Sequence, residues 1–496
     1  MSWAPAAAIL VSLIAAVLII LSRRHPNLRE AWTLIAAVAK LALVISILPS
    51  ILSGGIIELR ILRIASGLDL SLRVDPLGII FALVASSLWL LTSFYSIGYM
   101  RGSGEKKMTR YFASFAVCLS ATMGIAFAGN ILTFLLFYEI LTIATYPLVI
   151  HKETEEAIAA GRKYLVYTLS AGLCFLVAAG WTYHLTGTLD FKSGGFLNSV
   201  LESGAASPRQ LLFLFGLFIA GAGVKAGLMP LHAWLPSAMV APTPVSALLH
   251  AVAVVKAGVF AVVRIVGFVF GPTLLKEIGA WQILAWISGL TLIIASLIAM
   301  GQDNLKRRLA YSTIGHLSYI VLGAALLSPA SWTGALLHIV NHATMKITLF
   351  FCAGAIYVQT HKTQISQLNG IGRQMPITMA AFTIGALGLA GIPPINGFAS
   401  KWYLAKGTLE ADQAVFLVML LLSGVMNAAY FFPIVHAAFF RSSEDHQRRS
   451  EASLWMVAPL AITALVSIIL GVYPNALFRF QYLAQTVAAA VVGNGP

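Results

Sequence analysis

The chain of 496 residues is 59% hydrophobic, only 10% of its residues are charged, and its formal net charge is +14. Soluble domains average about a quarter charged residues, so this composition excludes an ordinary soluble domain and indicates an integral membrane protein. The excess of cations could suggest a nucleic-acid partner. However, the cations cluster in short loops between apolar runs, where they specify membrane topology. We therefore predict a lipid bilayer as the environment and no nucleic acid as partner.

Apolar runs approaching the roughly 20 residues that cross a bilayer as a helix recur along the chain. We predict an all-α membrane protein of about fourteen transmembrane helices, near residues 4–22, 31–53, 76–100, 110–129, 131–150, 161–185, 211–229, 240–269, 279–300, 309–328, 332–358, 376–408, 413–440 and 452–474. The first run lacks a basic flank and a cleavage site, so we expect a retained helix rather than a signal peptide. Two long connections, 54–75 and 186–210, could lie along the membrane surface. Residues 477–492 are apolar and are predicted to form an interfacial helix.

The loop charges predict the orientation of these helices. Eighteen Lys and Arg residues fall in loops after odd-numbered predicted helices and eight in loops after even-numbered ones. Because cytoplasmic loops carry the excess of cations, both termini are predicted to lie outside the cytoplasm. The expected location is a prokaryotic-type inner (plasma) membrane.

The cysteines give no sign of a redox or metal centre. Cys118, Cys174 and Cys352 are isolated, and each lies within an apolar run. Such residues usually behave as small buried hydrophobes, and no paired spacing typical of iron–sulfur or zinc sites is present. We expect no cofactor and no metal in this chain, so any redox chemistry would belong to other subunits.

Six cations lie inside the predicted helices, namely Lys40, Lys225, Lys256, Arg264, Lys346 and Lys401. Arg264 could lie near a helix end and extend to the interface. Each of the others costs about 2.5–3.5 kcal/mol or more at mid-bilayer unless it faces water or a partner. This cost points to a function in ion translocation.

Glu139 is the only carboxylate predicted to lie deep in the membrane, in the segment Phe134–Ile140. A lone buried carboxylate must be protonated, paired or hydrated. It could form a static ion pair that ties two helices together, or it could take part in ion movement. The candidate partner is Lys225.

Two segments combine an intramembrane lysine with glycines and prolines. Residues 221–236 hold three glycines and two prolines around Lys225, and residues 385–402 repeat the pattern before Lys401. Such segments predict broken helices, here the seventh and twelfth, which characteristically line cavities. We expect two inverted five-helix repeats, at 110–270 and 279–440, preceded by helices in 1–109 and followed by a last helix and C-terminal segment in 441–496.

Several histidines lie between these breaks. His250 and Lys256 share the predicted eighth helix, and His316 lies in the tenth. The eleventh helix carries three basic residues along one face, at i, i+4 and i+8, which are His338, His342 and Lys346. Buried histidines are often only structural, but this basic stripe favours a proton relay. Haem or zinc is disfavoured, because further ligands are missing and Lys346 would repel a cation.

At these motifs the chain resembles the antiporter-like subunits shared by respiratory complex I, multisubunit sodium/proton antiporters and membrane-bound hydrogenases. The similar motifs are Tyr138–Glu139, the segment 224–236, the segment 241–250 and the segment 255–259. The likeness is greatest to the D component of the multisubunit antiporters and to complex I subunits M and N. It implies that Glu139, Lys225, Lys256 and Lys401 carry proton translocation. It also implies partners, namely other membrane subunits, including related antiporter-like ones.

The mechanism expected from this resemblance is a movable ion pair. When Glu139 leaves Lys225, the uncompensated ammonium releases its proton towards Lys256. From there the proton would pass along the relay of His250, His316, His338, His342 and Lys346 to Lys401. The transported ion could be a proton or sodium. The alternative function is a stand-alone sodium or solute transporter, although a sodium site would favour oxygen ligands, which are scarce in the predicted interior.

Overall fold

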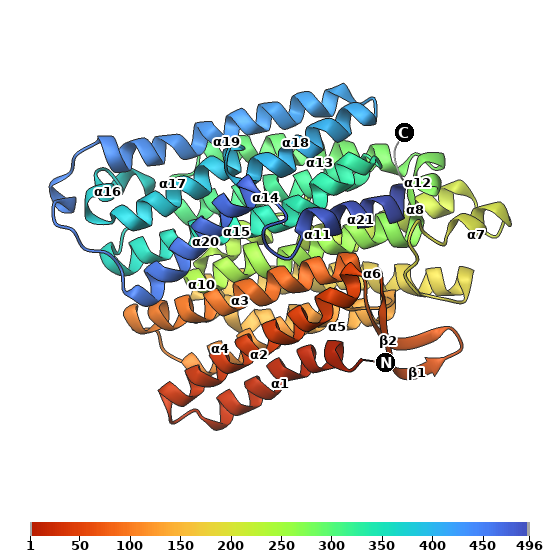
Figure 1. Cartoon of the computed structure of the whole chain (residues 1–496), viewed down its shortest axis with the longest axis horizontal. Helices are drawn as coiled ribbons and strands as arrows, with labels where there is room; N and C mark the ends of the chain where they lie inside the picture. Colours follow the sequence, from red (N-terminus) through yellow and green to blue (C-terminus); the bar gives the residue numbers. More distant parts are fainter. Residues whose placement is uncertain (1, 494–496) are drawn as a thin grey trace.

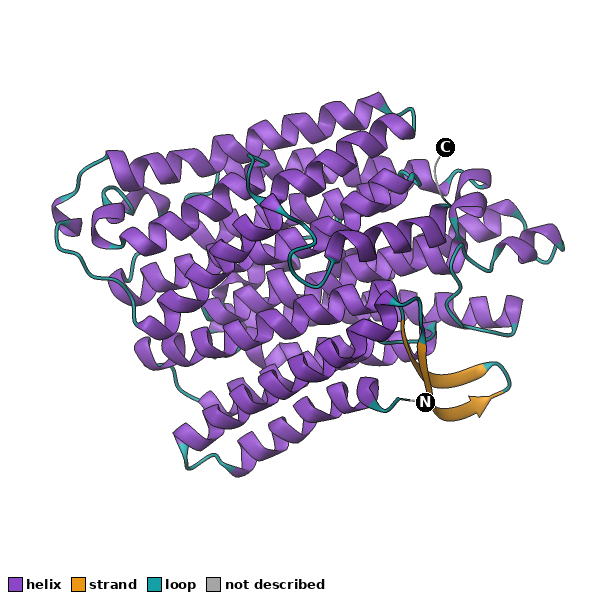
Figure 2. Cartoon of the chain, viewed as in Figure 1, coloured by secondary structure: helices purple, strands orange, loops and turns teal. Residues whose placement is uncertain are grey.

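The computed structural model describes residues 2–493. They form a bundle of helices whose axes are roughly aligned, with a small hairpin at one end (Figures 1 and 2). The long helices of the N-terminal half are α1 (Ala4–Leu21), α2 (Pro26–Leu52), α3 (Pro76–Gly102), α4 (Met108–Ala126), α5 (Ile131–Val149), α6 (Glu155–Thr186) and α8 (Pro208–Ala226). Short helices join them: α7 (Asn198–Glu202), α9 (Trp234–Ser237) and η1 (Ala238–Val240).

One continuous helical element follows, made of α10 (Thr243–Ala247), η2 (Leu248–Val252), α11 (Val254–Arg264) and η3 (Ile265–Phe270). The C-terminal half contains α12 (Pro272–Glu277), α13 (Ala280–Met300), α14 (Leu305–Ala325), α15 (Pro329–Thr360), η4 (Ile365–Gln367), α16 (Ile371–Gln374), α17 (Pro376–Ala390), α18 (Asn396–Glu410), α19 (Ala414–Phe440), η5 (Glu444–His446), α20 (Leu454–Val472) and α21 (Phe480–Val492).

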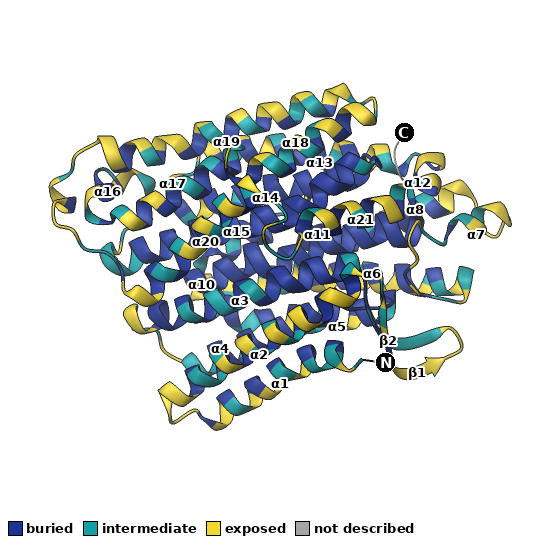
Figure 3. Ribbon diagram, in the orientation of Figure 1, coloured by how far each residue is buried: buried dark blue, intermediate teal, exposed yellow. Residues whose placement is uncertain are grey.

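The described residues contain eleven helices long and apolar enough to cross a membrane, which makes the chain a multi-pass membrane protein. Two of these spans, Thr243–Phe270 and Pro329–Thr360, are buried over the whole length of their most apolar windows. The outer helices α1, α2 and α6 expose apolar faces instead (Figure 3). The two central spans are therefore shielded from lipid on all sides.

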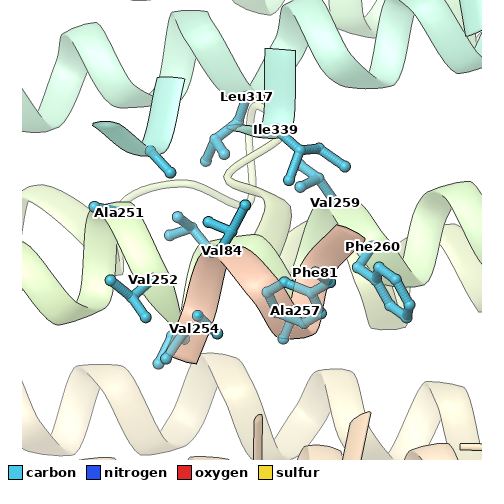
Figure 4. Close-up of a cluster of buried hydrophobic side chains, with 14 of the residues drawn as sticks. Phe81, Val84, Ala251, Val252, Val254, Ala257, Val259, Phe260, Leu317 and Ile339 are labelled. Carbon is cyan, nitrogen blue, oxygen red and sulfur yellow. The ribbon is translucent and has the colours of Figure 1, made fainter. Parts of the chain in front are cut away.

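Apolar side chains pack these central elements together. Phe81 of α3 lies against Phe260 of α11, with ring centroids 4.9 Å apart, and Figure 4 shows valines of α11 beside them. Leu317 of α14 and Ile339 of α15 close the other side of the cluster in the same view. Close packing of this kind fixes the side chains of α11, α14 and α15 that point to the interior.

The long connection predicted at 54–75 is a hairpin of strands β1 (Ile57–Ala65) and β2 (Leu68–Val74), paired antiparallel with Leu59 opposite Leu72. The turn uses Gly67, whose positive φ of 69° suits glycine. The Arg73 N–H donates to the Phe127 carbonyl (2.7 Å) and so fixes β2 to the α4–α5 connection. The segment thus projects at the end of the bundle as a hairpin (Figure 2).

The predicted interfacial helix at 477–492 is different in the structure. Helix α21 packs against α15 and α3 and runs along the direction of the bundle (Figure 1). Its apolar face is covered by protein, since Leu483, Ala484 and Val487 are buried. The prediction of a helix lying in the interface is therefore wrong.

The prediction that Arg264 extends to the interface is also wrong. Its guanidinium donates to both carboxylate oxygens of Asp75, at 2.5 and 2.8 Å, and its side chain is only 2% exposed. Asp75 also accepts from the Gly78 N–H at 2.7 Å and so caps α3. A bidentate carboxylate, rather than water, therefore compensates the charge of the guanidinium. The pair joins the N-terminus of α3 to the end of α11.

We expect Asp75→Asn to lower the free energy of unfolding by about 3–5 kcal/mol, because the variant leaves the Arg264 guanidinium buried without a counter-ion. Because asparagine still caps a helix, the loss of stability would come from the missing carboxylate charge and not from a lost helix cap. Thermal unfolding in detergent measures it. The double variant Asp75→Leu/Arg264→Leu is the control and should be more stable than Asp75→Asn, since both charges are gone. Equal losses would contradict the ion-pair explanation.

The same pair should make stability depend on pH. Burial by itself would raise the pKa of the Asp75 carboxyl, but the Arg264 charge and the hydrogen bonds from Arg264 and Gly78 outweigh burial and lower this pKa below its ordinary value. The stabilisation is therefore present above the unfolded-state pKa and is lost as pH falls through the folded-state pKa. The Asp75→Asn variant should lack this acid-dependent part.

Candidate functional site

Helix α8 ends directly after Lys225, inside the protein, and the backbone groups of its last turn are hydrogen-bonded there. Gly227 adopts the left-handed conformation (φ 70°) that ends the helix. The freed carbonyl of Val224 accepts a hydrogen bond from the Trp234 indole N–H at 2.7 Å. The backbone polar groups that a helix end leaves open are thereby paired, and Lys225 lies fully buried in the last turn.

Helix α11 approaches this helix end very closely, because Gly258 has no side chain. A Cβ atom at Gly258 would lie 2.2 Å from the Ala226 nitrogen and 2.4 Å from the Lys225 carbonyl carbon. Two helices can come this close only where one of them presents a glycine. The contact brings α11, which carries Lys256, against the turn that carries Lys225.

The Lys225 ammonium is held by Tyr138 of α5. Its Nζ donates to the Tyr138 carbonyl at 2.6 Å and lies 3.3 Å from the centroid of the Tyr138 ring. The Tyr138 hydroxyl in turn donates to the Gly221 carbonyl of α8 at 3.2 Å. A carbonyl and a ring face are neutral partners for a cation, so no fixed anion holds this lysine.

Glu139 is adjacent to Tyr138 but is not paired with Lys225 in this arrangement. None of the ion pairs within residues 2–493 involves either side chain. The carboxylate lies against α6 instead, and its buried Oε1 has no hydrogen-bond partner among the described residues. Glu139 and Lys225, which were predicted to form an ion pair, therefore do not form one in this structure.

The central basic groups come from three helices, and a fourth adds a hydroxyl. Lys256 of α11 donates to Nδ1 of His342 on α15 at 2.8 Å. His316 of α14 and His338 of α15 share a hydrogen bond of 3.1 Å, and the ring centroids of His316 and His342 are 5.4 Å apart. Ser400 of α18 lies 2.8 Å from the remaining ring nitrogen of His338. The structure thus places these four basic residues in one buried group.

Asn427 of α19 extends this group to Lys401, and sequence reasoning missed it. Its amide nitrogen donates to Nε2 of His316 at 3.2 Å and to the Leu389 carbonyl at 3.1 Å. Lys401 donates to the same carbonyl at 2.7 Å. The only signal in the sequence is the single amide side chain of the largely apolar run 414–440. Ser400, adjacent to Lys401, was likewise not singled out.

Lys346 belongs to a neighbouring set of contacts. Its Nζ donates to the Ser312 hydroxyl at 2.8 Å, and the Tyr430 hydroxyl donates to the same oxygen at 2.9 Å. The three basic residues of α15 therefore share a face but reach different partners. Tyr430 of α19 is a third residue that the sequence did not reveal.

Two basic residues stand apart from these contacts. His250 is fully buried in η2 with neither ring nitrogen hydrogen-bonded within residues 2–493, and its ring lies 4.9 Å from that of Phe350. Lys40 of α2 is buried 4.3 Å from the centroid of the Trp89 ring and has no hydrogen-bond partner in the same part of the chain. No direct hydrogen bond of the described residues joins His250 to either Lys225 or Lys256.

Two family models match the chain. The one described as "NADH:quinone oxidoreductase/Mrp antiporter, TM" matches residues 128–427, and the one described as "NADH-Ubiquinone oxidoreductase (complex I), chain 5 N-terminus" matches residues 64–112. The first match covers more than half of the chain and includes every basic residue of the buried groups just described except Lys40. The chain belongs to the NADH:quinone oxidoreductase/Mrp antiporter family.

Individual relatives agree with this assignment. NADH-quinone oxidoreductase subunit N of Desulforudis audaxviator is 31% identical over 442 residues, which are 85% of each protein. A probable K(+)/H(+) antiporter subunit of Rhizobium meliloti is 33% identical over 86% of this chain, but over only 42% of its own length. A solved chain of the archaeal membrane-bound sulfane sulfur reductase, a respiratory membrane complex, has a TM-score of 0.86 at 26% identity, with both chains fully covered.

The close approach of α11 to the end of α8 at Gly258 can be tested by substitution. We expect Gly258→Ala to lower the free energy of unfolding by about 1–3 kcal/mol, because the added methyl group meets backbone atoms that cannot rotate away. Thermal unfolding measures the change. Gly216→Ala in α8 is the matched control, since a Cβ there meets nothing within 4 Å. Equal stability of the two variants would contradict the close approach.

Proposed function

We propose that the chain is a proton-translocating, antiporter-like subunit of a multisubunit complex in a prokaryotic plasma membrane. The observation that carries this proposal is the series Lys225, Lys256, His342, His316 and Lys401, in which the first four side chains are buried and Lys401 is part-buried. Its members are held by carbonyls, rings and each other rather than by fixed carboxylates. Charged groups kept in this way inside a membrane protein generally belong to ion pathways.

The architecture we propose has fourteen transmembrane segments. The eleven long apolar helices supply eleven of them, and α4, α14 and the pair α17–α18 supply the other three. The ends of α8 at Ala226 and of α17 at Ala390 are the two helix breaks, each near a lysine. They support two inverted five-helix repeats over residues 110–270 and 279–440, with N-terminal helices in 1–109 and the last helix and C-terminal segment in 441–496.

The first step of the proposed mechanism is a change in the partner of Lys225. When Glu139 approaches, its carboxylate stabilises the protonated lysine. When the carboxylate withdraws to the position seen here, only the Tyr138 carbonyl and ring remain, and proton release towards Lys256 becomes easier. Because no protein hydrogen bond among the described residues bridges Lys225 and Lys256, we assign this step to water molecules, with His250 beside the route.

The later steps use the buried histidines. Lys256 passes its proton to His342, whose ring is stacked near His316. His316 connects through Asn427 to the carbonyl that holds Lys401, and His338 and Ser400 form a branch beside it. Imidazole suits such transfers because both of its protonation states are accessible near neutral pH. Lys346 acts from the side, close to Ser312.

Proton uptake is assigned to a cleft of about 770 Å³ at the end of the bundle where α6 and α14 begin. Its walls include Lys152, Lys163 and Lys306, and it reaches Thr243 at the start of the element that carries His250 and Lys256. Loops at this end carry the larger share of cations, so the positive-inside rule makes it the cytoplasmic end. Both termini then lie on the opposite side of the membrane.

Replacement of Lys225 by Met or of Glu139 by Gln should reduce proton translocation at least 100-fold, since a step that needs a titratable side chain then lacks it; 100-fold corresponds to about 2.7 kcal/mol. Proton uptake into sealed vesicles carrying the assembled complex measures the rate. Gly216→Ala is the control for handling and insertion. Unchanged pumping by an assembled Lys225→Met complex would refute the mechanism.

The proposed partners are other membrane subunits, including related antiporter-like ones, because the relative of Desulforudis is itself one subunit of an oxidoreductase. Gentle purification of the tagged native chain should therefore yield a complex with further membrane proteins, identified by mass spectrometry. A chain that purifies alone and transports sodium or a solute would instead support the stand-alone transporter. Sodium-dependent proton movement in vesicles distinguishes an antiporting complex from a purely proton-pumping one.

A further inference from the structure

The carboxylate of Glu139 rests on a glycine of the neighbouring helix. A Cβ atom at Gly172 of α6 would lie 2.5 Å from Oε1, 2.7 Å from Cδ and 3.1 Å from Oε2 of Glu139. Contacts below 3 Å essentially do not occur for real Cβ atoms. The position that the carboxylate occupies therefore exists only because residue 172 has no side chain.

We propose that Gly172 is a built-in seat for the Glu139 carboxylate, which holds it away from Lys225 and thereby sets how often the two groups pair. This inference rests on the proposed function and adds to it a positioning residue on a helix that carries none of the translocating groups. The term seat refers below to Gly172 and the space over its Cα.

The structure shows both members of the pair apart, which is what a seat requires. Lys225 keeps its contacts with the Tyr138 carbonyl and ring, while the Glu139 carboxylate lies against Gly172 of α6. The carboxylate gains no hydrogen bond at Oε1 within residues 2–493. At Oε1, shape rather than a polar partner keeps it there. A position without strong bonds can be left easily, as a movable counter-ion must do.

Helix α6 also touches the helix that carries Lys225. A Cβ at Gly221 of α8 would lie 2.8 Å from the Phe175 side chain and 3.0 Å from the Ala171 carbonyl. Ala171, Gly172 and Phe175 therefore form one turn of α6 that meets α8 on one side and the Glu139 carboxylate on the other. Because this turn is rigidly packed, a small shift of α6 changes the seat and the position of Lys225 together.

The test compares Gly172→Ala with Gly180→Ala in the assembled complex. Both variants add one methyl group to α6, but the methyl at 180 meets nothing within 4 Å, whereas the methyl at 172 occupies the seat. Expulsion of the carboxylate shifts Glu139 towards Lys225 and leaves the lysine proton bound. We expect Gly172→Ala to slow proton translocation in vesicles about tenfold, which corresponds to a shift of about 1.4 kcal/mol in favour of the Glu139–Lys225 pair. Gly180→Ala should match the wild type.

A variant with a shorter side chain at residue 139 distinguishes loss of the seat from general damage to α6. Glu139→Asp retracts the carboxylate by one methylene group and relieves the clash with the new methyl. The loss caused by Glu139→Asp should therefore be at least threefold smaller in the Gly172→Ala background than in the wild type. If Gly172→Ala alone does not assemble, the double variant should restore assembly. Strict additivity, or no restoration, would overturn the proposal, because simple misfolding does not depend on the length of residue 139.

The experiment also distinguishes this inference from the function beneath it. If Glu139→Gln pumps normally, the movable ion pair is wrong and the seat loses its purpose. If Glu139→Gln stops pumping but Gly172→Ala behaves like Gly180→Ala, the ion pair remains and only the seat is refuted. Slow pumping by Gly172→Ala together with the coupling to Glu139→Asp supports both.

Discussion

A buried ammonium group has left its hydration shell, and the protein must replace it without cancelling the charge permanently. The lysines of the site meet this constraint with neutral partners. Lys225 uses the Tyr138 carbonyl and ring, Lys256 uses an imidazole of His342, and Lys401 uses the Leu389 carbonyl. Arg264 shows the contrast, since its bidentate pair with Asp75 fixes the charge at the end of α3. Neutral partners stabilise each cation only partly and so leave its proton exchangeable.

The ends of α8 and α17 supply part of this neutral surrounding. Helix α17 ends at Ala390, and the carbonyls of Leu389 and Ala390 in its last turn both accept from Lys401. An unbroken helix would have used those carbonyls internally. The end of α8 solves the same problem differently, because the Trp234 indole pairs with the Val224 carbonyl. The lysine there turns to the carbonyl of another helix. Each of these helix ends thus lies beside a lysine, Lys225 at α8 and Lys401 at α17, that is held by backbone carbonyls.

Much of this organisation could be predicted from the sequence, because its signals are local. Hydrophobic runs gave most helices, and the Gly/Pro segments gave the positions where α8 and α17 end. The spacing of His338, His342 and Lys346 gave a shared helical face. The partners of that face could not be predicted, since Ser400, which contacts His338, and Lys256, which contacts His342, come from helices far away in the chain. The hairpin at 57–74 was missed although its alternation of side chains and its Ser-Gly turn are visible signals.

The position of Glu139 shows why the remainder needs coordinates. Its sequence neighbours predict a buried carboxylate that pairs with Lys225, whereas the structure has Lys225 at the carbonyl of the adjacent Tyr138. The actual resting place of Glu139 depends on the contact between α5 and α6, which no periodicity in either helix encodes. The orientation of α21 is another case, because an apolar face looks the same whether lipid or protein covers it.

The amide of Asn427 orients the hydrogen bonds beyond it. Since the amide donates to Nε2 of His316, the proton of that ring lies on Nδ1 and points to His338, whose own proton then points to Ser400 and onward to the Gly397 carbonyl. All bonds in this row have the same polarity. In the proposed relay, a proton passing from His316 through His338 to Ser400 would reverse the two bonds between these residues, and both rings would have to turn over before a second proton could follow. The bonds at the two ends would not reverse, because an amide nitrogen does not accept and a carbonyl does not donate. If the proposed branch carries protons, this turning of the two rings would set an upper limit on its rate.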